Sequence, residues 1–171
     1  MITKDDLLSY LGEIDLHLNQ KVTLVAVGGT AMTLYGLKES TRDVDFCALT
    51  KTDQDLILSI DKKITKPFRL DLFREGYIFI LQLPEDYVAK SKPFTTNFKN
   101  LSLRLLSPID LIITKASRLN ERDLEDIKSL VSKKRINKKK LIERSTIVQE
   151  SYPGRSAEIQ DRFEQVIKEF F

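Results

Sequence analysis

Hydrophobic and polar positions follow two different periods along the chain, and these predict a sheet followed by helices. Short apolar runs between turn residues predict strands, which we place at residues 22–27, 42–49, 68–73, 77–83 and 101–106. Apolar residues at helical spacing predict helices in the same half of the chain, which we place at residues 3–18, 30–35 and 52–60. The expected fold class is α/β (α+β), with a mixed β-sheet flanked by helices.

Capping and turn residues support several of these boundaries. Thr3 and Thr52 stand at the starts of two predicted helices, where a hydroxyl can cap free backbone amides. The stretch from Arg74 to Gly76 lies between two apolar runs and favours a hairpin turn. Residues 87–100 show no dominant period, and we expect a loop with some strand.

The remainder of the chain is predicted to be helical throughout. Ser107, Pro108 and Asp110 form a typical helix start, with a capping hydroxyl, a proline at the first position and an acid in the first turn. From there the pattern predicts helices at residues 108–118, 121–133, 138–150 and 155–170. Pro153 and Gly154 separate the last two of these helices.

Composition favours one globular unit and excludes several classes of protein. Of the 171 residues, 42% are hydrophobic, which is enough for a core, and Cys47 is the only cysteine, which excludes a disulfide framework. No apolar run approaches the roughly 20 residues of a membrane span, and the acidic N-terminus differs from a signal peptide. We expect a cytoplasmic protein with an α/β core of residues 1–106, including the N-terminal helix, and a helical region of residues 107–171 packed on it as one unit.

Two carboxylates in an apolar strand are the main chemical signal. Asp43 and Asp45 flank a single valine, and burying two like charges costs several kcal/mol unless a cation lies between them. The two-residue period of a strand places both on one face, where they can hold a metal ion. The alternative is a solvated strand end whose charge Arg42 neutralises.

A glycine pair and a third acid extend this candidate site. Gly28 and Gly29 follow a predicted strand and let the backbone approach a phosphate closely, and Thr30 opens a helix whose first amides favour an anion. Asp71 lies in the middle of another predicted strand. It can complete a two-metal site, or it can be a half-exposed residue paired with Arg69.

These residues together resemble the motif of the DNA polymerase β-type nucleotidyltransferase superfamily. The resemblance implies a nucleotidyltransferase-like fold in which Asp43 and Asp45 bind two Mg²⁺ ions, or Mn²⁺ in their place. It implies that Asp71 binds the catalytic ion and helps to deprotonate an attacking hydroxyl. The commoner motif is Gly-Ser, so Gly29 lacks a hydroxyl that could contact phosphate, and Thr30 is the nearest substitute. We include Arg42 among the nucleotide-binding residues.

The following helices narrow the resemblance to AbiEii-type toxins and related nucleotidyltransferase-like proteins. Lys115 and Arg118, followed by an Arg-Asp pair that contains Asp123, match the pattern of that branch. The resemblance implies that Lys115 neutralises nucleotide phosphates and that Asp123 orients Lys115 or the acceptor. The alternatives are a lysine that extends from the helix surface and, for Asp123 and Asp126, local ion pairs.

The implied reaction moves an NMP from an NTP to a hydroxyl acceptor and releases pyrophosphate. The acceptor is RNA, tRNA or a protein side chain, and a toxin of this kind would have an antitoxin partner. A catalytically inactive nucleotide-binding or regulatory module of the same fold is the alternative. Basic clusters at residues 133–135 and 138–140 are either a solvated face or an RNA contact. The base preference, the oligomeric state and the role of residues 135–171 have no sequence signal.

Overall fold

The protein is described by a computed structural model that covers residues 1–151, 154 and 156–171, so the predicted separator Pro153 lies outside the described residues. Its strands are β1 (Ile2–Thr3), β2 (Val22–Ala26), β3 (Ser40–Thr41), β4 (Val44–Ala48), β5 (Leu70–Arg74), β6 (Tyr77–Ile78), β7 (Leu81–Gln82), β8 (Lys92–Phe94) and β9 (Leu101–Leu105). Its helices are α1 (Lys4–His17), α2 (Gly28–Leu34), α3 (Lys51–Asp61), α4 (Tyr87–Lys90), α5 (Pro108–Ala116), α6 (Glu121–Lys134), α7 (Lys138–Ser151) and α8 (Ser156–Phe170).

One mixed sheet forms the centre of the molecule, with strands in the order β7-β6-β5-β4-β2-β9-β8. The central strand β4 pairs with β2 in antiparallel and with β5 in parallel orientation, and β2 also pairs with β9 in parallel orientation. Every residue of β4 is buried, which explains why all of them but Asp45 are apolar. The predicted mixed sheet with flanking helices is confirmed.

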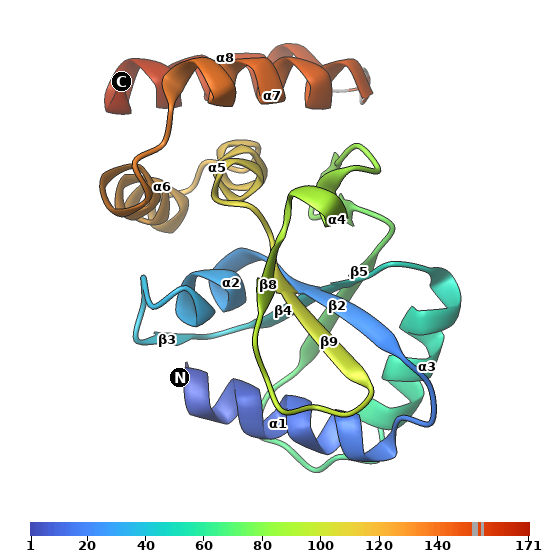
Figure 1. The fold of residues 1–171 in the computed structure, drawn as a ribbon. Coiled ribbons are helices and arrows are strands. Elements are labelled where there is room, and N and C mark those ends of the chain that lie inside the picture. Colours follow the sequence, from blue (N-terminus) through green and yellow to red (C-terminus); the bar gives the residue numbers. More distant parts are fainter. Residues whose placement is uncertain (152–153, 155) are drawn as a thin grey trace.

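A helical layer covers one side of this sheet. Helices α5 and α6 lie between the sheet and the outer pair α7 and α8 (Figure 1). The Asp110 carboxylate, which is fully buried in α5, accepts hydrogen bonds of 2.8 and 3.2 Å from the Arg144 guanidinium in α7. This two-pronged ion pair fixes the outer layer to the inner one. The division at residue 106 stays a prediction.

Four local predictions differ from the structure. Helix α2 begins at Gly28 rather than at Thr30, which lies inside its first turn. Helix α3 is capped by Thr50, whose hydroxyl accepts a hydrogen bond from the Asp53 amide at 3.1 Å, so Thr52 lies inside the first turn. The apolar run 77–83 is not one strand, because a turn at Phe79 folds it into the hairpin β6–β7. The predicted strand 42–49 begins only at β4, so the first acid of the motif precedes the strand.

The smaller differences concern segments without a strong local signal. Residues 87–100 contain the short helix α4 and the strand β8, where a loop with some strand is expected.

The helix cap at Thr3 and the helix start at Ser107 are confirmed. Each hydroxyl accepts a hydrogen bond from the backbone amide of the residue three positions further along the chain, Asp6 and Asp110 respectively. Within the described part of the chain, no helix combines the length and the apolar character that a membrane span requires.

Candidate active site

A cleft of about 370 Å³ lies where the sheet meets α5 and α6, and acidic and basic side chains line it. One side, which we call the sheet wall, consists of Gly29, Thr41, Arg42, Asp43, Asp45, Asp71, Phe73 and Phe79. The opposite side, the helical wall, consists of Lys115, Arg118, Asn120, Arg122, Asp123 and Asp126. Lys38, from the connection between α2 and β3, completes the lining.

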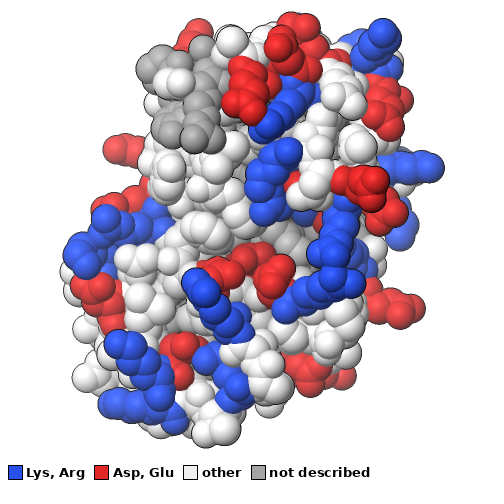
Figure 2. All heavy atoms as spheres, turned by 180° about the vertical axis from the view of Figure 1, so that it is seen from behind, with Lys and Arg blue, Asp and Glu red and all other residues white. Residues whose placement is uncertain are grey.

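The molecule seen from behind shows how these charges are distributed (Figure 2). Acidic side chains gather in a hollow near the middle of this face, between the larger lower part and the upper helical part. Lys and Arg side chains stand around the hollow. Such an arrangement can bind a polyphosphate only if cations also offset the central acids.

The sheet wall brings together the three predicted metal ligands. Asp45 and Asp71 are register partners on the parallel strands β4 and β5, so their side chains project from the same face of the sheet. Asp43 immediately precedes β4 and is exposed, whereas Asp45 is only 6% exposed. The side chain of Asp71 is 39% exposed. Its Oδ1 atom lies 3.0 Å from Nε of the highly exposed Arg69, with which it forms an ion pair. An ion pair this open to solvent is weak, so it leaves Asp71 available.

Burial and like charges act together on Asp45. Burial and, after it, the neighbouring carboxylates of Asp43 and Asp71 together raise the pKa of its carboxyl to about 7. Arg118 and Lys115 act in the opposite direction with a smaller effect. No cation among the described residues forms an ion pair with Asp45. The carboxylate would therefore be stabilised by an added positive charge.

Thr30 lies beneath the acids and holds their backbone. Its buried hydroxyl donates a hydrogen bond to the Asp43 carbonyl at 3.1 Å and accepts one from the Asp45 amide at 2.9 Å. The hydroxyl is therefore used inside the protein. A direct phosphate contact by Thr30, which the sequence suggested, does not fit this arrangement.

The two glycines are required by close packing around the same acid. Gly28 has a left-handed φ of +54°, and a Cβ there would lie 2.8 Å from the Asp45 Oδ2 atom and 3.0 Å from the Phe79 ring. A Cβ on Gly29 would lie 2.6 Å from the Thr41 hydroxyl. Of the pair, only Gly29 lines the cleft, so its backbone is the part that faces a ligand.

The helical wall holds a chain of alternating charges. Lys115 is only 2% exposed, and its Nζ lies 2.7 Å from Asp126 Oδ2 and 3.4 Å from Asp123 Oδ1. The other oxygen of Asp126, Oδ1, forms an ion pair with Lys38, whose Nζ lies 3.0 Å away. Asp123 accepts a further contact of 3.0 Å from Arg118. Lys115 is therefore a buried, fixed cation rather than a lysine that extends from the helix surface.

Arg118 connects the helical wall to the sheet wall. Its guanidinium lies 3.7 Å from the centre of the Phe79 ring, which packs edge-on against Phe73. Phe79 has a φ of +55°, a conformation that is unfavourable for a residue with a Cβ. Arg118 Nε and Asp123 Oδ2 are the buried side-chain atoms without a hydrogen-bond partner among the described residues. The strained backbone and the unpaired atoms thus lie side by side in the lining of the cleft.

Eight residues that line the cleft were not predicted as site residues: Lys38, Thr41, Phe73, Phe79, Arg118, Asn120, Arg122 and Asp126. Arg118 and Asp126 belong to the motif cluster of the helical region, so a sequence signal for them exists. Lys38 and Phe79 carry no such signal, because one follows a short helix and the other lies in an apolar run. Both reach the cleft only through the packing of distant segments.

Comparisons with known proteins show the family to which the chain is similar. A family model described as "Nucleotidyltransferase of unknown function (DUF6036)" matches residues 5–170. Among solved structures, the chain is similar to an antigenic nucleotidyltransferase-like protein from Paracoccidioides brasiliensis, with 16% identity and a TM-score of 0.49. That similarity covers 93% of this chain and 94% of the other. No curated protein matches the chain.

Proposed function

The chain belongs to the family of nucleotidyltransferases of unknown function that its sequence matches, and on this premise we propose that it transfers an NMP from an NTP to a hydroxyl acceptor. The observation that supports this is the position of Asp45 beside Asp71, opposite the fixed cations Lys115 and Arg118 of the helical wall. In the proposed reaction the acceptor oxygen forms a bond to the α-phosphorus. The bond from that phosphorus to the β-phosphate oxygen breaks, and pyrophosphate leaves.

The carboxylates of the sheet wall suit divalent cations in their chemistry. Asp43, Asp45 and Asp71 offer only oxygen atoms, which Mg²⁺ prefers, and the raised pKa of Asp45 indicates an unmet need for positive charge. Among the described residues no three acidic, histidine or cysteine side chains form a complete metal site. Mg²⁺ commonly takes one or two carboxylates together with substrate phosphates, so we propose that the nucleotide completes the site. Bound there, the ions would supply charge stabilisation at the phosphates.

The protein's own groups have separate roles in this proposal. Asp71, which is half-exposed, accepts the proton of the attacking hydroxyl. Lys115 and Arg118 provide fixed positive charge for the phosphates, and Asp123 and Asp126 keep these cations in place. The backbone at Gly29, the exposed side chain of Arg42 and the half-buried side chain of Lys38 also face the nucleotide.

Two further possibilities remain within this proposal. The acceptor can be RNA, tRNA or a protein side chain, and a toxin role would appear as growth arrest on expression that a partner antitoxin relieves.

The second candidate function is an inactive nucleotide-binding module. It is favoured by one observation: Gly29 replaces the commoner serine, and the nearby Thr30 hydroxyl is used internally. That candidate predicts nucleotide binding without any transferred product.

Calorimetry with a non-hydrolysable NTP, with and without Mg²⁺, tests the proposal. We expect Mg²⁺-dependent binding by the wild type and its loss in Asp45→Asn and Asp71→Asn. Asp55→Asn is the matched control, because Asp55 is an exposed acid on α3, away from the cleft, whose ion pair is with the exposed Lys51. The proposal is wrong if Asp45→Asn binds as the wild type does, or if none of the four nucleotides binds.

A further inference from the structure

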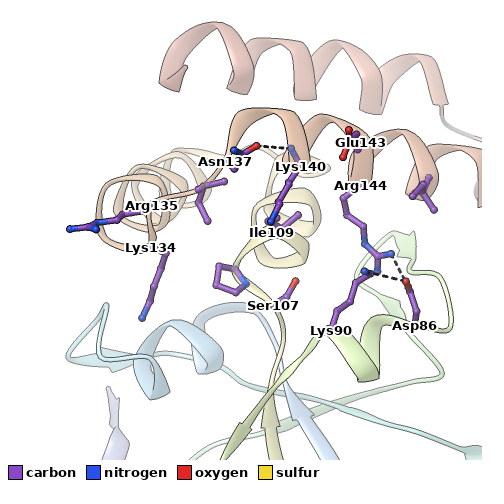
Figure 3. A pocket seen from close by; sticks show the side chains of 13 residues that line it. Asp86, Lys90, Ser107, Ile109, Lys134, Arg135, Asn137, Lys140, Glu143 and Arg144 are labelled. Carbon is purple, nitrogen blue, oxygen red and sulfur yellow. Dashed lines mark hydrogen bonds and ion pairs between the residues drawn. The ribbon is translucent and has the colours of Figure 1, made fainter.

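A second cavity lies at the far end of the helix pair that forms the helical wall. It measures about 600 Å³ and is therefore larger than the acid cleft. Lys90 of α4, Pro108 and Ile109 of α5, Lys134 of α6 and Lys140 of α7 line it, and we call it the basic groove. Figure 3 shows Lys140 pointing down into the space and Lys90 rising from below, while Lys134 lies at one side, where its Nζ is 4.7 Å from the centre of the Tyr35 ring.

Positive charge in the basic groove is largely unneutralised. Of its two acids, Asp86 already pairs with Arg144 at 2.7 Å and with Lys90 at 3.6 Å, while Glu143 lies 3.9 Å from Lys139, which does not line the groove. Among the described residues no carboxylate forms an ion pair with Lys134, Arg135 or Lys140. These cations belong to a run in which six of the eight residues from 133 to 140 are Lys or Arg. The groove therefore attracts a polyanion.

The groove and the acid cleft are connected by the same two helices. Helix α6 begins beside the cleft, which Asp123 lines, and ends beside the groove, which Lys134 lines. Its 14 residues span roughly 20 Å at 1.5 Å per residue. One strand of a nucleic-acid duplex carries a phosphate about every 3.4 Å, so that distance corresponds to a short oligonucleotide. The groove and the cleft therefore lie about one helix length apart, at the two ends of α6.

We propose that the basic groove binds the phosphodiester backbone of a nucleic-acid acceptor whose terminal hydroxyl reaches the acid cleft, an inference that rests on the function proposed above. The floor of the groove is aliphatic, and none of its lining residues is aromatic. It has no ring on which a base could stack, so recognition falls on phosphates rather than on bases. Binding should accordingly depend weakly on sequence and strongly on salt.

Fluorescence anisotropy with a labelled 20-nucleotide RNA and the DNA of the same sequence tests this, without NTP or Mg²⁺. We expect Lys134→Glu/Lys140→Glu to weaken binding about tenfold or more and to lower the salt slope by about 1.4, the loss for two single-strand phosphate contacts. Lys133→Glu/Lys138→Glu is the matched control, since it makes the same charge change in the same basic run but outside the groove. It should weaken binding no more than about threefold.

Each other outcome has a defined meaning. Equal losses in the two double variants would show a diffuse basic surface, and absence of binding to both nucleic acids would also overturn the proposal. Competition by poly-glutamate as strong as that by RNA would assign the groove to an acidic protein segment instead. Equal affinity for RNA and DNA would support a backbone contact that ignores the 2′-hydroxyl, whereas preference for RNA would identify the acceptor class.

The same variants separate this inference from the proposed function. Asp45→Asn should bind RNA as the wild type does, and the groove variant should bind the nucleotide analogue as the wild type does. Loss of nucleotide binding in Asp45→Asn, with intact RNA binding, would test the cleft alone. Thermal melting of both double variants excludes unfolding, and Lys140→Glu alone provides a milder change at an exposed residue.

Discussion

Asp126 and Asp45 lie on opposite walls of one cleft, and both are almost completely buried. Asp126 contacts two cations, Lys115 at 2.7 Å and Lys38 at 3.0 Å. Asp45 forms no ion pair among the described residues and lies beside two further acids, which raise its pKa to about 7 together with burial. The comparison shows that burial alone does not define a carboxylate's role. The neutralised acid stabilises the wall, whereas the acid without a partner is left for a ligand.

The largest expected difference between the walls is in catalysis. Asp45→Asn should reduce nucleotidyl transfer by about 10³-fold or more, because it removes a metal-binding charge, while leaving the free energy of unfolding unchanged or higher. Transfer of label from an α-labelled NTP to total RNA or protein, combined with thermal melting, measures both. An Asp45→Asn protein that is unstable as well as inactive would place Asp45 in the same structural role as Asp126.

Next in size is the stability of the helical wall. Asp126→Asn should lower the free energy of unfolding by about 3 kcal/mol, because it leaves the buried Lys115 without its closest partner. Urea denaturation measures this change, and the exposed Asp55→Asn variant should change stability by less than about 0.5 kcal/mol. If Asp126→Asn were as stable as the control, the charge chain would not hold the wall together.

The pH dependence of stability should sharpen the contrast further. The pKa of Asp45 is raised in the folded protein, so folding favours its protonated form. Its stabilising contribution is complete below the unfolded pKa of about 4 and is lost as the pH rises through about 7. With a chelator present, the loss should be on the order of 3 kcal/mol. Denaturation of the wild type and of Asp45→Asn between pH 5 and pH 8 measures it, and a wild-type profile as flat as that of the variant would contradict it.

The smallest expected effect concerns the support beneath the acids. Thr30→Val should cost about 2 kcal/mol, because the buried Asp45 amide loses its acceptor and the carbonyl of Asp43 loses one of its two hydroxyl donors, keeping Thr41. Thr30→Ser keeps the hydroxyl and should recover most of this stability. Chemical denaturation of the two variants, with Mg²⁺-dependent nucleotide binding as a second readout, distinguishes support of the acids from simple packing. Equal stability of Val and Ser at this position would argue against such support.

Much of the sheet wall could be predicted from the sequence. Asp43, Asp45 and Asp71 are acids within or beside apolar strands, which made them visible as candidates, and the parallel pairing of β4 with β5 then places Asp45 beside Asp71. The glycine pair was also visible, although its reason differs from the expected one: Gly28 is required by contact with Asp45 and Phe79 as well as by its backbone conformation.

The sequence by itself determined the order of elements, the three acids and the basic run, because these depend on local periodicity and on residue type. The tertiary structure decided that Lys115 is buried, that Lys38 pairs with Asp126 and that Phe79 packs under Arg118. It also placed the cleft and the basic groove at opposite ends of α6. These features depend on contacts between segments far apart in the chain, and a local pattern carries no information about which distant partner a side chain will meet.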